Sequence, residues 1–396
     1  MKTLATKTSR IYSPQFITMS LSNLFTVSSF GSFFLFPIFI TVHGGSESDI
    51  GIIMGIFALS AVICRPWVSE MIDRIGRKRS YTIGSIIMSA LPLTYLLFQG
   101  DLSGFYIPLI VVRILHGIGL AICFTSAFTY IGDIVPESRL NEGIGIFGVT
   151  GLMGLAIGPV IGEIMIRNFG FSTFFVYATG IAIVGLLLHL PVPESYAQSS
   201  SVSYHTFSSI LLKKKFLAVA ILAILFGFAL SASSNFVSPY AKGLNLPFIS
   251  LYYISYSLAA VLTRFAGGGR LTDKIGENRI IPYALILAGG GLFILIFLEG
   301  NGTLVISGLM SGCAHGFLFP ALNSLAIRNE PVNIRGKITG VFTGGIDAGS
   351  FAGSIILGYI GEWVGFRAIF FTASIILLAG LGLYKTGIID NNEKTV

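Results

Sequence analysis

The chain has 396 residues, of which 11% are charged and 53% are hydrophobic, whereas a soluble protein of this size carries about 25% charged residues. Its mean hydropathy of +0.82 agrees with this composition. These values exclude a water-soluble globular enzyme, a disordered chain and a nucleic-acid-binding protein built on a basic face. The three cysteines lie in apolar runs, so we expect no disulfide framework.

A series of long apolar runs dominates the sequence. A membrane-spanning helix needs ~20 mostly apolar residues, and with short loops each span uses roughly 30, so the length allows about twelve spans. The runs are too long for barrel strands and lack their in–out alternation. The first run starts after ~15 polar or mixed residues and lacks a small-residue cleavage site, so we expect no removable signal peptide. In chain order the runs cover 16–42, 50–70, 81–99, 105–131, 141–166, 172–191, 216–239, 248–269, 280–298, 303–327, 338–361 and 367–386.

Lys and Arg predict the orientation of these spans. With a cytoplasmic N-terminus, 21 of the 25 basic residues fall at the inner ends of the spans, Arg65 among them. Arg113 lies within a span, and three basic residues lie outside: Arg167, Lys242 and Arg367. This asymmetry predicts a multi-pass protein of the plasma (inner) membrane with both termini in the cytoplasm. It also explains the net charge of +7, because the excess faces the cytoplasm and anionic lipid.

The chain repeats itself around its widest gap between runs. Residues 192–215 contain Pro193, a Ser-rich stretch and three lysines, and we expect them to be a cytoplasmic linker between residues 1–191 and 216–396. Parallel six-helix repeats about an axis along the membrane normal are a known transporter architecture. The repeated segments are Asp73–Gly76 with Asp273–Gly276, His116-Gly117 with His315-Gly316, and Gly154, Gly158, Gly170, Phe171 and Phe175 with Gly349, Gly353, Gly365, Phe366 and Phe370.

Three motifs occur in order along the first half. The loop after the second run reads Ser69-x-x-x-Asp73-Arg74-x-Gly76-Arg77-Lys78. The fourth run contains Arg113-x-x-His116-Gly117-x-Gly119, and the fifth contains Gly154-x-x-x-Gly158-Pro159-x-x-Gly162-Glu163.

Over nearly its whole length the sequence resembles a twelve-helix member of the major facilitator superfamily, and its fifth run resembles the signature of drug:proton antiporters. Three positions depart from the family patterns: Ser69 and Glu163 replace glycines, and His116 replaces a glutamine. The resemblance implies an all-α polytopic membrane protein with twelve helices in two pseudo-symmetric six-helix bundles. It further implies secondary transport by alternating access.

The loop after the second run is a candidate conformational latch. Its residues are Asp73, Arg74, Gly76 and Arg77, with Asp273 and Gly276 in the second copy. An ionised Asp73 could be held by an arginine or a helix N-terminus in one transport state and released in the other. The alternative is a positive loop that only sets the orientation.

Two charged residues lie deep in the predicted spans, one in each half. Arg113 is a candidate for binding an anionic substrate group, because a charge at this depth should face a wet cavity or the bundle interior. Asp347 is the most deeply placed acid, which makes it a candidate proton carrier. We expect both in a central cavity. The alternatives are a hydrogen-bonding strut for Arg113 and a carboxylate paired with a Ser or backbone donor for Asp347.

Other polar residues in the spans are candidates for the same cavity. His116 and His315 occupy equivalent positions and could titrate near neutral pH. The alternative for both is hydrogen-bonded packing, and no Cys or second His lies at the spacing of a metal site. The remaining candidates are Asn23, Asn235 and Asn323.

Glycines spaced four apart form two stripes, Gly154-Gly158-Gly162 and Gly345-Gly349-Gly353. Such stripes predict close helix contacts, which we expect between the halves, where tightly packed helices can slide and seal. Pro159 can bend the fifth helix.

We expect neither a cofactor nor an enzymatic activity. Gly143-x-Gly145-x-x-Gly148 fits a dinucleotide fingerprint, but it opens a membrane helix and not a βαβ unit. The sequence contains no nucleotide-binding loop of the Gly-x-x-x-x-Gly-Lys-Ser/Thr type and no nucleophile–base set or metal cluster at depth.

The leading functional hypothesis is proton-coupled export of a small amphipathic molecule or drug. The alternatives are transport of a specific metabolite, a siderophore or a lipid by the same fold, in either direction. The expected partners are a small-molecule substrate, protons and membrane lipids, with no nucleic acid, and the expected oligomeric state is a monomer.

Overall fold

The computed structural model describes residues 11–195, 214–265, 275–327 and 332–385. The first half contains α1 (Pro14–Ser32), η1 (Phe33–Leu35), α2 (Phe36–Val42), α3 (Glu47–Ile75), α4 (Arg77–Thr94), η2 (Tyr95–Leu97), η3 (Leu102–Gly104), α5 (Tyr106–Ile134), η4 (Glu137–Arg139) and α6 (Leu140–His189). The second half contains α8 (Lys214–Gly243), α9 (Leu251–Thr263), α11 (Glu277–Ile294), η6 (Leu295–Phe297), α12 (Asn301–Ile327), α13 (Val332–Val364) and α14 (Phe366–Lys385).

These helices account for the twelve predicted spans. Within the described ranges, ten helices are long and apolar enough to cross a membrane. The longest, α6, contains two spans, because Gly170 has a φ of +82° and interrupts it. The shorter apolar helix α9 supplies the one remaining span of the twelve. The predicted all-α architecture is therefore confirmed.

Local sequence signals explain where several helices begin and end. A capping box starts α3: the Ser46 hydroxyl accepts from the Asp49 backbone N–H, and the Asp49 carboxylate accepts from the Ser46 backbone N–H. Gly76 ends α3 with a φ of +104°, a conformation that favours glycine. Gly276, its counterpart in the second half, has a φ of +88°. The repeat seen in the sequence is thus also a repeat of turn geometry.

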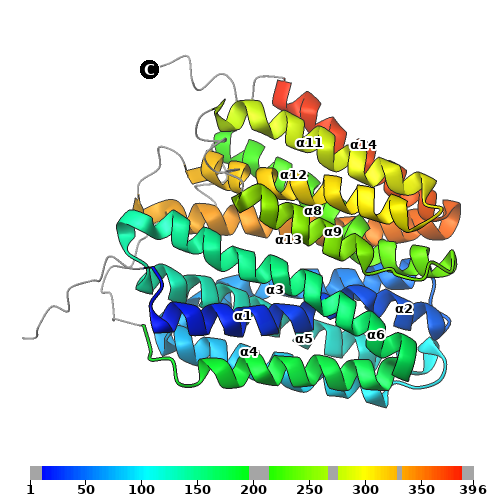
Figure 1. Cartoon of the computed structure of the whole chain (residues 1–396), viewed down its shortest axis with the longest axis horizontal. Helices are drawn as coiled ribbons and strands as arrows, with labels where there is room; N and C mark the ends of the chain where they lie inside the picture. The colour runs from blue at the N-terminus through cyan, green and yellow to red at the C-terminus, as the bar shows by residue number, and fades with distance from the viewer. Residues whose placement is uncertain (1–10, 196–213, 266–274, 328–331, 386–396) are drawn as a thin grey trace, which may run out of the picture.

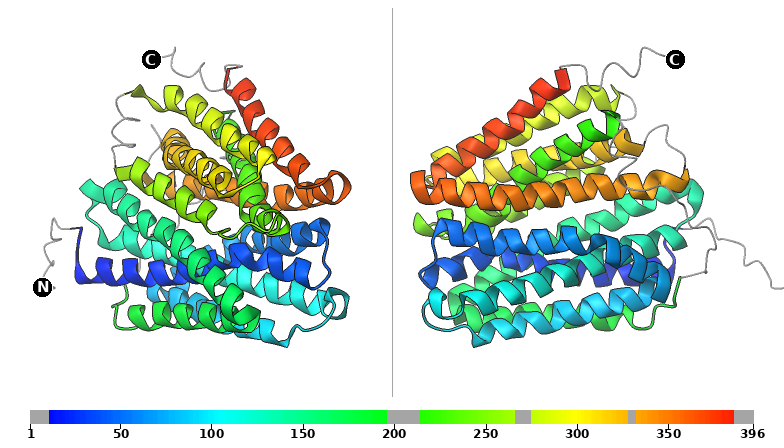
Figure 2. Two further views of the ribbon diagram at one scale, coloured as in Figure 1. Left: turned by 45° about the vertical axis from the view of Figure 1, so that its right-hand side comes forward. Right: turned by 180° about the vertical axis from the view of Figure 1, so that it is seen from behind.

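The helices form two bundles that lie side by side. In Figure 1, α1 to α6 make the lower bundle and α8 to α14 the upper one, and Figure 2 shows the same division from two other sides. Each half has an even number of spans, so α1 begins and α14 ends at the same end of the molecule. We call this the terminal end and the opposite one the distal end. Helices α3 and α13 pack together across the boundary between the halves, and so do α6 and α9.

The two predicted glycine stripes pack within the halves and not between them, so that part of the prediction is wrong. A Cβ added at Gly154 would lie 2.9 Å from Ser28 N on α1, and one at Gly158 would collide with the Ser28 carbonyl oxygen. A Cβ at Gly162 would lie 3.0 Å from the Phe174 ring, inside α6. On α13, Cβ atoms at Gly345, Gly349 and Gly353 would all meet α8.

Other glycines bring the halves together. A Cβ at Gly51 of α3 would lie 3.1 Å from the Cα of Gly358 on α13, and one at Gly55 would lie 3.3 Å from the Ser354 Cβ. Both contacts lie in the part of α3 near the distal end. Close backbone approach through small residues, the principle behind the predicted stripes, therefore operates between the halves at different positions.

Candidate functional site

A charged pair crosses the boundary between the halves. The guanidinium of Arg65 on α3 forms an ion pair with Asp347 on α13 and donates to Thr343 Oγ1 at 2.8 Å. The Arg65 side chain is 25% exposed and that of Asp347 is 31% exposed. Arg65 is ten residues before the end of α3, which places it about 15 Å from that end along the helix axis. Arg65 therefore lies at mid-depth, and its assignment to the inner end of a span is corrected.

Arg113 and Asp347 do not share a site, contrary to expectation. Arg113 is 1% exposed, and no acid in the described ranges forms an ion pair with it. Its guanidinium carbon lies 6.0, 5.2 and 4.4 Å from the ring centroids of Phe33, Phe36 and Phe57. These rings stabilise the cation by cation–π contact. The face of α5 that carries Arg113 packs against helices of its own half. The Arg113 side chain therefore points into this cage of aromatic rings and not toward α13.

The equivalent histidines are held by equivalent aromatic contacts. His116 Nδ1 lies 3.2 Å from the Tyr95 hydroxyl, and its ring meets that of Phe33 edge-on at 4.8 Å. His315 Nδ1 is hydrogen-bonded to the Tyr256 hydroxyl, and its ring meets that of Phe226 edge-on at 5.3 Å. His116 is buried and His315 is half-buried. Each histidine thus contacts partners in its own half.

The three asparagines also link helices within one half. Asn23 Nδ2 donates to Thr150 Oγ1 at 2.9 Å, which joins α1 to α6. Asn235 Nδ2 donates to Ser354 Oγ at 2.7 Å, which joins α8 to α13. Asn323 Oδ1 accepts from Thr339 Oγ1 at 3.3 Å. Among the described contacts of the seven predicted central residues, only those of Asp347 cross between the halves.

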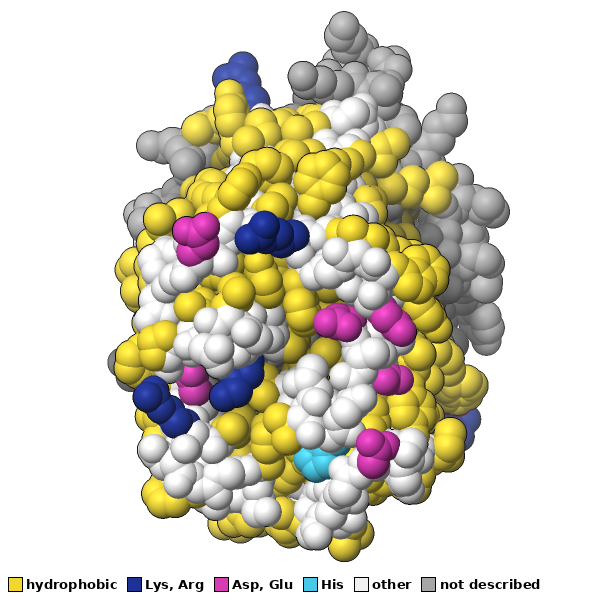
Figure 3. Space-filling model, turned by 90° about the vertical axis from the view of Figure 1, so that its right-hand side faces the viewer, with side chains coloured by type: hydrophobic (Ala, Val, Ile, Leu, Met, Phe, Trp, Pro, Cys, Tyr) yellow, Lys and Arg dark blue, Asp and Glu magenta, His cyan; other side chains and the backbone are white. Residues whose placement is uncertain are grey.

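Glu163 joins the two halves at the distal end. In the sequence it stood out only because it replaces a glycine of the family pattern. Its carboxylate accepts from the backbone N–H groups of Ile249 and Ser250 at 2.8 and 2.7 Å. The acid on α6 thus caps the start of α9 in the other half. Nearby, Arg167 Nη1 donates to the Pro247 carbonyl at 3.1 Å. Figure 3 shows this end of the molecule.

Removing this cap is expected to open the distal end. A hydrogen bond to a charged group contributes about 1.5–3 kcal/mol, so Glu163→Ala should raise the population of the distal-open state roughly tenfold or more. The measurement is the rate at which an impermeant maleimide labels a cysteine at Ser238, which donates to the Phe34 carbonyl at 2.7 Å across the boundary. Native cysteines are first removed. Glu163→Gln should give an intermediate rate, and identical rates in all three proteins would show that the cap does not hold this end closed.

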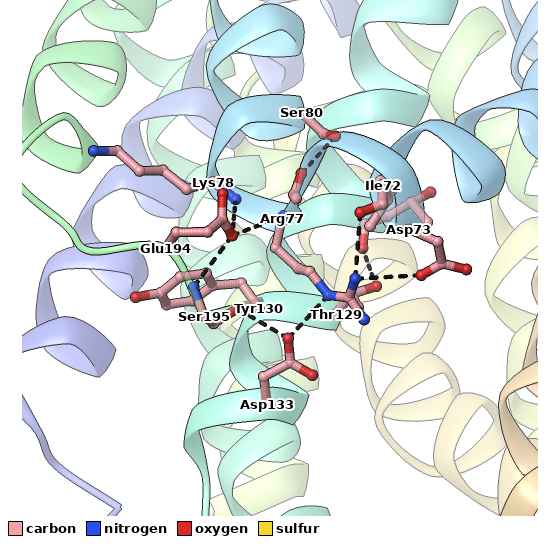
Figure 4. A network of polar contacts seen from close by, with 12 residues as sticks. Ile72, Asp73, Arg77, Lys78, Ser80, Thr129, Tyr130, Asp133, Glu194 and Ser195 are labelled. Carbon is pink, nitrogen blue, oxygen red and sulfur yellow. Dashed lines mark hydrogen bonds and ion pairs between the residues drawn. The ribbon is translucent and has the colours of Figure 1, made fainter. Parts of the chain in front are cut away.

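The candidate latch forms a polar network at the terminal end. The Arg77 guanidinium contacts two acids, with Nε 3.0 Å from Asp133 Oδ2 and Nη1 3.3 Å from Asp73 Oδ1. The Glu194 carboxylate accepts from three backbone N–H groups at the start of α4 at 2.8, 3.0 and 3.3 Å. Ser195 Oγ donates to Asp133 Oδ2 at 2.9 Å. Figure 4 shows how these contacts join α3, α4 and α5 to the segment that follows α6.

Of the other predicted latch residues, Gly76 lies against the Glu194 carboxylate, with which a Cβ would collide. The rest lie apart from this network or outside the described ranges. Arg74 pairs with Glu70 at 2.5 Å on the exposed side of α3. Gly276 starts α11, and Asp273 lies outside the described residues. Asp133 and Glu194 were missed because neither belongs to the repeated loop. The chain brings them to it only through packing.

Asp133 is expected to matter more than Asp73 in this network. The Asp73 side chain is 72% exposed, whereas that of Asp133 is 30% exposed and accepts from two donors. Exposed ion pairs contribute at most about 1 kcal/mol. Asp73→Asn should therefore leave insertion intact and slow transport modestly, and Asp133→Asn should slow it several-fold more. Initial transport rates per inserted molecule test this. Wild-type turnover in Asp73→Asn would contradict the latch hypothesis, and equal rates in both variants would contradict the ranking.

Comparisons with known proteins agree with this architecture. A family model described as Major Facilitator Superfamily matches residues 18–298 and 219–388. Multidrug resistance protein 2 of Bacillus subtilis is 26% identical over 379 residues, which cover 92% of each chain. The staphylopine export protein of Staphylococcus aureus is 23% identical over 347 residues, covering 85% of this chain and 86% of that protein. A solved POT family transporter, in complex with a thioalcohol-conjugated peptide, superimposes with a TM-score of 0.79 at 14% identity, over 96% of each chain.

Proposed function

The chain belongs to the major facilitator superfamily as an integral multi-pass secondary transporter and not an enzyme, and we propose that it exports small amphipathic molecules or drugs in exchange for protons. The names of the similar multidrug resistance and staphylopine export proteins support export. The staphylopine exporter also favours the second candidate, export of one specific metabolite.

We further propose that the terminal end faces the cytoplasm and that the protein lies in the inner membrane. The basic residues of the sequence support this orientation, because only Arg167, Lys242 and Arg367 belong to the distal end. The proposed domains are residues 1–191 and 216–396, joined by a cytoplasmic linker over 192–215. In this orientation the end closed by Glu163 is extracellular, so the arrangement corresponds to a state closed to the outside.

The observation that carries the proposal is the pair between Arg65 and Asp347. A carboxylate and a guanidinium in a membrane protein stabilise one another, and removing the charge of one leaves the other uncompensated. Protonation of Asp347 would therefore weaken the tie between α3 and α13. Such a change biases the equilibrium between the open states. If the substrate favours the state with ionised Asp347, substrate and proton oppose one another, as antiport requires.

Transport in proteoliposomes tests the proposal directly. A ligand-dependent thermal-shift screen of drugs, siderophores, sugars and lysolipids first identifies molecules that bind. We expect a bound molecule to be moved against its gradient when a pH gradient is imposed, and we expect a proton ionophore to abolish accumulation. Accumulation that is indifferent to the ionophore would contradict proton coupling, and facilitated equilibration alone would contradict active export.

A further inference from the structure

A second arginine occupies the boundary between α6 and α9 at a place that the repeat relates to Arg65. Arg264 follows Arg65 by 199 residues, the spacing that also separates His116 from His315. Gly148 on α6 precedes Thr343 by 195 residues, the spacing between Gly154 and Gly349. Arg65 Nη1 donates to Thr343, and Arg264 Nη1 lies 3.1 Å from the position that a Cβ of Gly148 would take. The two guanidinium groups therefore reach equivalent points on the opposite half.

The two arginines differ in their partners. Arg65 meets Asp347, but the residue that precedes Asp347 by 195 positions is Leu152. In the described ranges Arg264 has neither an ion pair nor a hydrogen bond, and its Nε is buried without a partner. Its guanidinium carbon lies 5.8 Å from the centroid of the Phe319 ring. A guanidinium inside a membrane protein is expensive without an anion. In the described ranges Arg113 is stabilised by three aromatic rings and Arg264 by one, which makes Arg264 the candidate for binding an anion during the transport cycle.

The surroundings of Arg264 suit the rest of an amphipathic molecule. Gly148 has no side chain, and in the described part of the chain no other atom from outside its own helical stretch lies within 4 Å of a Cβ built there. The rings of Phe319, His315 and Tyr256 follow one another at centroid distances of 5.6 Å and 5.6 Å. An aromatic or aliphatic body could pack on this row of rings while its charged group meets the guanidinium.

We propose that Arg264 binds an anionic group, such as a carboxylate, of the transported molecule at the boundary between α6 and α9. This inference rests on the proposed export function and names its substrate class: amphipathic molecules that carry an anion. A guanidinium recognises a carboxylate through two parallel N–H···O hydrogen bonds, which a lysine cannot reproduce. Arg113 is not the anion-binding residue in this scheme, because it is sealed among aromatic rings.

The test uses two dyes that differ in one carboxylate. Tetramethylrhodamine carries a free carboxylate, and its methyl ester carries none. We expect wild-type protein to bind the free acid at least tenfold more tightly than the ester. Arg264→Gln should weaken binding of the acid at least tenfold and change binding of the ester less than threefold. Arg264→Lys keeps the charge and should fall between wild type and Arg264→Gln for the acid alone. Arg279→Gln, on the exposed terminal end of α11, is the matched control and should leave both affinities unchanged.

The outcomes separate this inference from the export function. If wild-type protein shows no preference for the acid, the inference is overturned. It is also overturned if Arg264→Gln weakens both dyes equally, because that pattern belongs to an arginine that only supports the fold. Thermal unfolding of each variant identifies such a loss of fold. Proton-driven transport of the ester or of any other bound amphiphile would leave the export function standing in either case, whereas its absence for every bound molecule would contradict that function.

Discussion

Gly158→Leu is expected to abolish transport and to destabilise the protein strongly. Gly158 lies against α1, where even a Cβ would collide with the Ser28 carbonyl oxygen and lie 2.7 Å from Ser32 N. These are backbone atoms, so the clash can be relieved only by moving one helix away from the other. Overpacking costs about 1–3 kcal/mol and occasionally more, and we expect the upper end here because the clash is with backbone atoms. The measurements are the thermal unfolding midpoint of the purified protein and the transport rate per inserted molecule.

Gly180→Leu is the matched control for this prediction. Gly180 lies in the second span of α6 and is exposed, and in the described part of the chain no atom from outside its own helical stretch lies within 4 Å of a Cβ built there. The same substitution should leave its unfolding midpoint and transport close to wild type. If Gly158→Leu is as stable and active as Gly180→Leu, the contact between α1 and α6 is not needed in the folded transporter.

Asp347→Asn is expected to abolish proton-driven accumulation while retaining substrate binding. The amide keeps the shape of the side chain and one accepting oxygen, but it carries no charge and cannot lose a proton. Breaking a buried ion pair costs about 3–5 kcal/mol, and we expect the lower end because both partners are partly exposed. The protein should therefore fold, exchange substrate down its gradient, and lose the pH dependence of transport.

Two further variants make this prediction specific. Arg65→Gln should also impair accumulation, and adding it to Asp347→Asn should cause little further loss, because the two residues act through one contact. Asp101→Asn changes an exposed acid that accepts from the Ser103 backbone at 2.9 Å, and it should leave coupling intact. If Asp347→Asn still accumulates substrate with unchanged pH dependence, another acid carries the proton, and Glu163 is then the first alternative.

The sequence was sufficient to predict the spans and the two-bundle fold. Those properties depend on the lengths of the apolar runs and on the internal repeats, and both can be read directly from the sequence. The partner of Asp347 was not predictable, because Arg65 stands close to a basic loop and was counted with it. Depth also does not reveal the direction of a side chain around its helix. Arg113 is buried in the bundle interior, yet its side chain points into an aromatic cage and not toward Asp347.

The contacts between the halves also could not be predicted from the sequence. The glycine stripes were correctly read as close-packing surfaces, but the same spacing fits a neighbour within one half as well as a neighbour across the boundary. Glu163 and Arg264 differ from the glycine stripes, because a sequence signal singles out each of these two residues. Glu163 departs from a glycine pattern, and Arg264 has the repeat spacing from Arg65. The sequence does not show that Glu163 and Arg264 lie at the same boundary between the halves, which follows from the packing of α6 against α9.

Proton release on substrate binding is the most direct test of the claim that Asp347 couples transport to protons. Purified protein in weakly buffered solution with a pH indicator receives a saturating amount of a bound molecule. The pH is set where binding of the molecule depends on pH, so that Asp347 is protonated in part of the protein. Because linkage is reciprocal, a substrate that favours ionised Asp347 must expel the proton from that part when it binds. We predict that wild-type protein releases protons and that Asp347→Asn, binding the same molecule, releases none. Equal release from both proteins would contradict the claim.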